Sequence, residues 1–182
     1  MKTINSFTFF LAFTFSILPQ ALISNDLRSP SINGLKAFQG KGYTISFPDN
    51  WRVMRGFMGA DLVGHEPYLT DLSKPKPSVT VYVESKPQTL SDLEYLDATR
   101  QSLKKAIGTS EQIIFTKNNS FFKECHEANY EMVKDEYSAA NRVLIFFRNN
   151  IVYTITISLP HDISYKDNAI VDSIIESFHF EG

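Results

Sequence analysis

Cysteine is almost absent from this chain: Cys125 is the only one among 182 residues. A single thiol cannot form an internal disulfide, so the stability of the fold has to come from the packing of its core. The excess of charge is small as well, with a formal net charge of -2 at pH 7. This balance favours neither a nucleic-acid-binding protein nor a protein drawn to acidic membranes.

Long apolar runs are missing too, except at the start of the chain. Lys2 precedes twelve almost purely apolar residues at 7–18. A short cationic lead, about 7–15 apolar residues and small residues beyond them are typical of a secretory signal, and such a stretch is too short to span a bilayer. We therefore predict a signal peptide at residues 1–24, cut after Ala21 or Ser24, and a periplasmic or secreted protein. An uncleaved leader, kept as a single membrane anchor, is the alternative.

The rest of the chain has the length of one ordinary domain. Residues 25–40 are polar, contain Asn33-Gly34 and show little periodicity, so they are expected to form a flexible tether. The domain is expected at residues 41–182. Hydrophobic residues make up 43% of the chain and charged residues 21%, which is typical of a folded globular protein rather than a disordered one.

Alternating apolar and polar residues predict several strands. The alternation is clearest at residues 43–47, 79–84 and 151–159. Asn149-Asn150 suits the positive φ angles of a tight hairpin that leads into the last of these strands. Less regular strands are expected at residues 51–54, 60–64, 113–115, 122–133 and 143–148, with a short one at Phe180.

Two amphipathic helices are predicted. Ser91 and Glu94 have the spacing of a capping box at the start of the first helix, and Gly108 is placed to end it. Its apolar side is expected to carry Leu93, Leu96, Leu103, Ala106 and Ile107. The second helix begins near Ser164 and carries the stripe Ile170, Val171, Ile174, Ile175 and Phe178. Hairpin-linked strands and two one-sided helices predict an α+β fold, an antiparallel β-sheet sandwiched by helices.

One stretch resembles a known family. Phe38-Gln39-Gly40-Lys41-Gly42-Tyr43, the strand that follows and Pro48-Asp49-Asn50-Trp51 are similar to the opening of the PsbP-like family. That opening is an aromatic residue, x-Gly-x-Gly, an aromatic residue, a strand and Pro-x-x-Trp. The strand followed by Pro-x-x-Trp also opens DcrB-like periplasmic proteins of the same superfamily. The order of the later elements, including a last helix with Ser-x-x-x-Ser-Phe at residues 173–178, extends the resemblance over about residues 38–180.

The resemblance implies an α-β-α sandwich around an antiparallel sheet. Members of this superfamily include an extrinsic photosystem II subunit, a nuclear Ran-binding import factor and bacterial envelope proteins. The resemblance therefore suggests a tendency to bind partners and implies no reaction. The export signal favours the bacterial envelope branch.

No set of residues singles out a catalytic, cofactor-binding or metal site. Cys125 and His126 are neighbours on an expected strand and so point to opposite faces, which argues against a catalytic dyad. His65-Glu66 or His161-Asp162 could contribute to a zinc site only if other ligands gathered around them in space. The lone Trp51 is expected in the core rather than as a stacking platform.

Two further stretches have plain interpretations. Gly40-Lys41-Gly42 is too short for a phosphate-binding loop and is expected to lead into a strand. Lys74-Pro75-Lys76-Pro77 is expected to be an exposed connector that could contact a partner. We therefore predict an exported, non-enzymatic protein without a cofactor, which binds a protein partner. A small-molecule or metal-binding protein with a pocket between sheet and helix is one alternative, and a hydrolase is another.

Overall fold

The computed structural model describes residues 34–67, 76–108, 113–118, 124–134, 137–161 and 165–182. Within these residues the strands form two sheets, and every pairing is antiparallel. The small sheet has the order β1 (Leu35–Gln39), β2 (Tyr43–Pro48) and β10 (His179–Phe180). The large sheet has the order β3 (Arg52–Arg55), β4 (Leu62–His65), β5 (Ser78–Ser85), β9 (Ile151–Pro160), β8 (Tyr137–Arg148), β7 (Cys125–Lys134) and β6 (Thr116–Asn118).

The helices are α1 (Asp92–Ile107), α2 (Tyr165–Glu176) and a short 3-10 helix, η1 (Phe57–Gly59). The two predicted helices and the predicted antiparallel strands are therefore present, except that residues 113–115 are not a strand and β6 follows them. The strands are also divided between two sheets rather than gathered in one. The proline turn after β2 carries the chain into β3, which pairs with β4 in the large sheet. Part of the expected tether is also a strand, because β1 pairs with β2 from Leu35 to Gln39.

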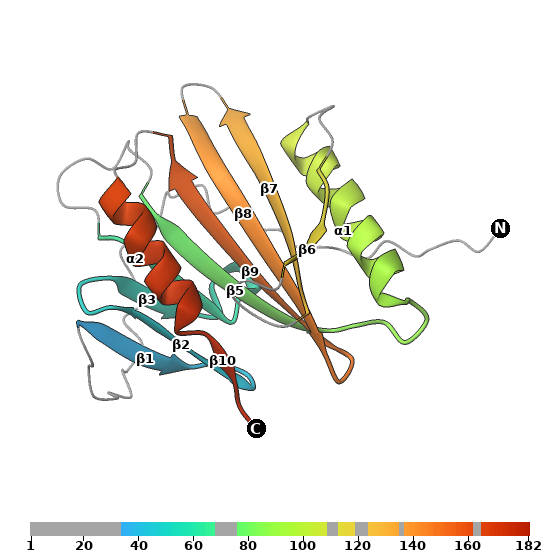
Figure 1. Cartoon of the computed structure of the whole chain (residues 1–182), viewed down its shortest axis with the longest axis horizontal. Helices are drawn as coiled ribbons and strands as arrows, with labels where there is room; N and C mark the ends of the chain where they lie inside the picture. Colours follow the sequence, from blue (N-terminus) through green and yellow to red (C-terminus); the bar gives the residue numbers. More distant parts are fainter. Residues whose placement is uncertain (1–33, 68–75, 109–112, 119–123, 135–136, 162–164) are drawn as a thin grey trace.

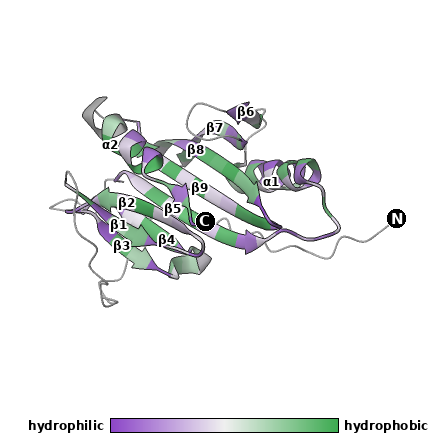
Figure 2. Ribbon diagram, turned by 60° about the horizontal axis from the view of Figure 1, so that its bottom comes forward, coloured by the Kyte–Doolittle hydropathy of each residue, from purple (hydrophilic) through white to green (hydrophobic). Residues whose placement is uncertain are grey.

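The two helices lie against opposite faces of the large sheet (Figure 1). Tyr95 and Leu96 of α1 pack against Val143, Ile145 and Val152. The strand residues between these, such as Leu144 and Phe146, point to the other face because neighbours along a strand alternate. There they meet α2 and the small sheet. In Figure 2, hydrophobic segments run along β8 and alternate with paler ones along β9, whereas α1 mixes hydrophobic and hydrophilic residues.

The start and end of α1 are confirmed, but its buried side differs from the prediction. The Ser91 and Glu94 capping box is formed, and Gly108 ends the helix with φ 69°. Leu93 is 74% exposed, however, and Ala106 is also exposed. The buried residues are Tyr95, Leu96, Thr99 and Leu103. Polar residues can occupy this side because the Thr99 hydroxyl donates to the Tyr95 carbonyl oxygen and the Tyr95 hydroxyl donates to Glu84.

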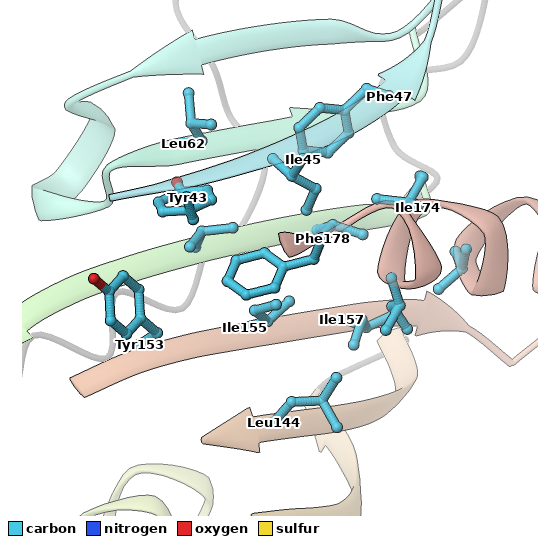
Figure 3. Close-up of a cluster of buried hydrophobic side chains, with 14 of the residues drawn as sticks. Tyr43, Ile45, Phe47, Leu62, Leu144, Tyr153, Ile155, Ile157, Ile174 and Phe178 are labelled. Atoms are coloured by element: carbon cyan, nitrogen blue, oxygen red, sulfur yellow. The ribbon is translucent and has the colours of Figure 1, made fainter. Parts of the chain in front are cut away.

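The main core lies between the small sheet, α2 and the large sheet (Figure 3). Phe178 stacks between Tyr43 and Phe146, with ring centroids 5.1 Å and 5.6 Å away. Ser177 precedes Phe178 in the chain, and its hydroxyl accepts a hydrogen bond from the Ser46 amide at 2.7 Å. This bond extends the contact with β2 beyond the last residue pair of β10 and β2, His179 and Thr44. The Ser-Phe pair at the end of α2 therefore closes the small sheet and the core together.

Candidate functional site

The β1–β2 turn, Gly40-Lys41-Gly42, packs directly on two tyrosine side chains. A Cβ atom on Gly40 would overlap the ring of Tyr43. A Cβ atom on Gly42, which has φ +78°, would lie 2.9 Å from the hydroxyl of Tyr153. The glycines of this motif therefore let the backbone close over the tyrosines, in addition to leading into β2.

Asp61 joins this turn to the β3–β4 loop, residues 56–61. Its carboxylate accepts a hydrogen bond from the Lys41 backbone amide at 2.9 Å and lies 3.7 Å from the Lys41 ammonium nitrogen. Its own amide donates to the Val81 carbonyl oxygen of β5 at 2.8 Å. Because Asp61 is only 9% exposed, these contacts hold the loop and the turn in one fixed arrangement.

The Tyr43 hydroxyl lies beneath this arrangement, hidden from solvent. Within the described residues it has no hydrogen-bond partner of regular geometry. Burial, and then the neighbouring Asp61 carboxylate, raise the pKa of the Tyr43 phenol. The phenol therefore stays neutral, and the cluster of Tyr43, Asp61 and Lys41 supports the loop rather than offering a reactive group.

Met58 stands at the tip of the β3–β4 loop in an unusual state. Its side chain is 50% exposed, and its backbone is left-handed, with φ 49° and ψ 37°. Residues with a Cβ atom, apart from asparagine, rarely adopt this conformation, because the Cβ atom comes too close to the following carbonyl oxygen. An apolar side chain is thus held out to solvent at a strained position.

Two cationic side chains lie near the base of the same loop, whose two ends are side by side because Arg55 pairs with Leu62. Arg55 precedes the loop, is exposed, and donates from Nη2 to the Gln39 carbonyl oxygen of β1 at 2.7 Å. Lys41 is tied to Asp61 at the other end, and its side chain is 74% exposed. We call Lys41, Arg55, Phe57, Met58 and Asp61 the loop–turn site.

Sequence reasoning located the Gly-Lys-Gly turn but missed Met58 and Asp61. The available signal was the pair Phe57-Met58 enclosed by Gly56 and Gly59, since apolar residues are unusual between the glycines of a turn. The contact of Asp61 with Lys41 joins residues 20 positions apart and leaves no local pattern.

Cys125 and His126 point to opposite faces of the sheet, as the alternation of a strand predicts. Cys125 is 2% exposed in the main core, and burial raises the pKa of its thiol to about 12. The ring of His126 lies 6.0 Å from that of Phe147, on the α1 side. The two groups are therefore not placed to share a proton.

The other sequence candidates lie apart from one another. Trp51 is 9% exposed and stacks on Phe47 in the core, as expected. His161 is 47% exposed and lies 3.5 Å from Glu131, while Asp162 falls outside the described residues, as do Lys74 and Pro75. Lys76 lies 4.0 Å from Glu66. Across the described residues, no three His, Cys, Asp or Glu side chains gather as metal ligands would.

A dense polar cluster on the α2 side of the large sheet is internally satisfied. The Glu127 carboxylate accepts from Arg142 Nε at 2.8 Å and Nη2 at 3.1 Å, from Asn129 at 3.1 Å and from Asn118. Burial alone would raise the pKa of Glu127, but these hydrogen bonds outweigh it and lower the pKa. Arg142 also lies 3.7 Å from Asp172 of α2. The cluster therefore holds β6, β7, β8 and α2 together.

Acidification is expected to destabilise the fold through His65. This side chain is 5% exposed, and its Nδ1 atom lies 2.8 Å from the Glu66 carbonyl oxygen. Burial is the largest influence on this ring and lowers its pKa. Below about pH 6.5 the unfolded chain therefore takes up a proton that the folded chain resists, and the free energy of unfolding falls. Urea unfolding at about pH 7.5 and about pH 5.5 measures this loss.

The His65→Gln variant should lose less stability between these two pH values than the wild type. His179→Gln, a change at an exposed histidine, is the matched control and should keep the wild-type pH dependence. Equal pH dependence in His65→Gln and the wild type would show that another group carries the effect.

Comparisons with known proteins agree with this fold. A model of the PsbP family matches residues 33–180. The solution structure of cyanobacterial PsbP (CyanoP) from Synechocystis sp. PCC 6803 is similar, with 15% identity, a TM-score of 0.57, and coverage of 86% of this chain and 98% of that chain. No curated protein sequence matches the chain at a significant level.

Two further structures share the fold at lower identity. LpqN of Mycobacterium tuberculosis is 9% identical, with a TM-score of 0.50 over 77% of this chain and 83% of its own. The Ran-binding protein Mog1p of Saccharomyces cerevisiae is also 9% identical, with a TM-score of 0.50 over 76% of this chain and 90% of its own. Within the described residues, no helix has the length and hydropathy needed to cross a membrane. The family match spans both sheets and both helices, so the chain belongs to the PsbP family.

Proposed function

We propose that this chain is an exported, non-enzymatic protein that binds a protein partner through the loop–turn site. The observation that carries the proposal is Met58, an apolar side chain that is 50% exposed at a backbone position favouring glycine or asparagine. Backbone strain of this kind costs about 1–2 kcal/mol and concentrates at functional positions. Folding alone gives no reason to keep methionine there.

The surroundings of Met58 suit recognition. Asp61 fixes the loop through the Lys41 amide and through β5, so little conformational entropy is lost when a partner binds. Methionine is flexible and polarizable, and it adapts to the shape of an apolar pocket. Arg55 and Lys41 add charged contacts at the rim.

Two relatives support this proposal by what they are known for. Mog1p is a Ran-binding protein, which places a protein-binding function on this fold. LpqN is involved in cell envelope biogenesis, which agrees with the export signal predicted at residues 1–24. Their sequence identity of 9% carries neither partner to this chain.

Photo-crosslinking in the producing cells tests the proposal. A photoreactive amino acid is introduced at position 58 or, as a control, at Leu93, which is 74% exposed on α1. We expect position 58 to crosslink to one protein in the envelope or secreted fraction, and position 93 to give no such product. An unprocessed chain in the cytosol would contradict export, and equal products at both positions would contradict the site.

The Met58→Asn variant separates binding from folding. Asparagine tolerates the left-handed conformation, so the free energy of unfolding should stay the same or rise by up to about 1 kcal/mol. Affinity for the crosslinked protein should fall at least about thirtyfold, as for a hot-spot residue. Leu93→Gln, which removes an exposed apolar side chain from a helix, should leave affinity unchanged.

A further inference from the structure

We propose that Met58 is a site of reversible oxidation: a peroxide converts its thioether to a sulfoxide, and the oxidised side chain no longer binds the partner. The oxidation follows from the exposure of Met58 alone. The loss of binding rests on the proposed function and adds the regulation of the same site. Export, as proposed above, would place this site outside the reducing cytosol.

Met58 is the most accessible of the methionine side chains that the structure describes. It is 50% exposed, whereas Met132 is 9% exposed and Met54 is partly buried in β3. The fourth methionine, Met1, belongs to the predicted signal peptide. An oxidant has to touch the sulfur atom, so access decides which thioether reacts first. A mild oxidant is therefore expected to modify Met58 before Met54 and Met132.

The single thiol of the chain does not compete for the oxidant. Cys125 is 2% exposed in the main core, and burial raises the pKa of its thiol to about 12. The thiolate, which is the reactive form of cysteine, is therefore scarce at neutral pH, and the sulfur atom is covered as well. An oxidant that meets the folded domain thus reaches Met58 before Cys125.

The reaction at Met58 is a two-electron oxidation. Hydrogen peroxide transfers one oxygen atom to the sulfur: the O–O bond breaks, an S–O bond forms, and both protons leave in a water molecule. The sulfur lone pair supplies the two electrons that the peroxide gains. A methionine sulfoxide reductase reverses the step with two thiols, which form a disulfide while the oxygen leaves as water. Both reagents have to reach the side chain, which the exposure of Met58 permits.

The fold around the loop does not depend on the Met58 sulfur. The Asp61 amide donates to the Val81 carbonyl oxygen at 2.8 Å, and the Asp61 carboxylate accepts from the Lys41 amide at 2.9 Å. Backbone and carboxylate groups make these contacts, so a sulfoxide at position 58 leaves them in place. The oxidised protein is therefore expected to stay folded, with an unchanged midpoint of urea unfolding.

Oxidation changes what a partner meets at this position. The thioether is apolar and flexible, and it adapts to an apolar pocket. The sulfoxide is polar, and its oxygen is a hydrogen-bond acceptor that would lose its water in such a pocket. Desolvation of an unpaired polar group opposes binding, so we expect the affinity to fall at least about tenfold.

Peptide mass spectrometry on the folded protein tests the oxidation. The purified exported protein is treated with dilute hydrogen peroxide for increasing times and then cut with trypsin, and cleavage after Arg55 separates Met54 from Met58. We expect Met58 to gain an oxygen atom clearly faster than Met54 and at least about tenfold faster than Met132. In urea the three should react at similar rates. Equal rates in the folded protein would overturn the proposal.

Reduction of the oxidised protein tests the reversal. Two methionine sulfoxide reductases are added together, because each acts on one epimer of the sulfoxide. They should return Met58 to the thioether without urea. A sulfoxide that persists in the folded protein, and is reduced only after unfolding, would overturn the reversibility.

Affinity for the protein crosslinked at position 58, measured after removal of the peroxide, completes the test. Oxidation of the wild type should lower this affinity at least about tenfold, and the reductases should restore it. Met58→Leu keeps an apolar side chain but forms no sulfoxide, so its affinity should be the same before and after peroxide. Unchanged affinity in the oxidised wild type, with binding still lost in Met58→Asn, would overturn the regulation and leave the proposed function standing. Unchanged binding in Met58→Asn would overturn both.

Discussion

Replacing Phe178 by alanine is expected to lower the free energy of unfolding by about 3–5 kcal/mol. Phe178 is 1% exposed, and its ring stacks on Tyr43 from β2 and on Phe146 from β8. Truncation would open a cavity where the two sheets and α2 meet, with no neighbouring segment free to fill it. Urea unfolding followed by the fluorescence of Trp51, the only tryptophan, measures the loss.

Phe180→Ala provides the comparison. Phe180 contacts Tyr153 and Phe178 at ring distances of 4.9 Å and 5.2 Å but remains partly exposed in β10. Its truncation should therefore cost clearly less than that of Phe178. Similar losses for the two variants would mean that Phe178 does not occupy the centre of the core.

Replacing Gly64 by alanine is expected to destabilise the fold by about 1–3 kcal/mol through overpacking. Gly64 lies in β4 and faces the small sheet, and a Cβ atom there would overlap the ring of Phe47. That ring is 0% exposed and is stacked on Trp51, so it has little room to move aside. The same urea experiment gives the size of the effect.

A second substitution shows whether the Phe47 ring is the cause. In Phe47→Leu the smaller side chain leaves space for a methyl group at position 64. The double variant should therefore be more stable than the sum of the two single effects predicts. Additive effects would place the strain of Gly64→Ala elsewhere in the sheet.

Sequence reasoning succeeded where the signal lies within a few residues. The capping box of α1 needs only Ser91 and Glu94, and the β8–β9 hairpin needs Asn149 and Asn150, whose φ angles are 50° and 62°. The alternation in β9 is equally local, since each side chain reports its own face. The strand and helix pattern therefore gave the α+β class.

The division into two sheets could not be obtained in this way. The alternation in β2 indicates a strand, but it does not say that its neighbours are β1 and β10. Ser46 and Ser177 bond across 131 positions of sequence, and nothing near either residue marks the other. The exposure of Leu93 was missed for a similar reason: the buried side of α1 includes Tyr95 and Thr99, whose polar atoms are satisfied by Glu84 and by the helix itself.

The loop–turn site was predictable only in part. The Gly-Lys-Gly motif drew attention to residues 40–42 through the family resemblance, but not to the tyrosines that explain its glycines. The strain at Met58 is a backbone angle within the loop between the paired strands β3 and β4. A single left-handed residue of this kind leaves no periodic pattern in the sequence.

The small sheet has a consequence for how the protein is made. Its middle strand, β2, is synthesised early, yet it gains β10 and the Ser177 contact only when residues 177–180 have been added. Until then Tyr43 lacks the Phe178 ring that covers it. A nascent polypeptide therefore remains open until nearly all of the domain has left the ribosome. Late closure of this kind is compatible with the export proposed above, in which a polypeptide is threaded through a narrow translocation pore before it folds.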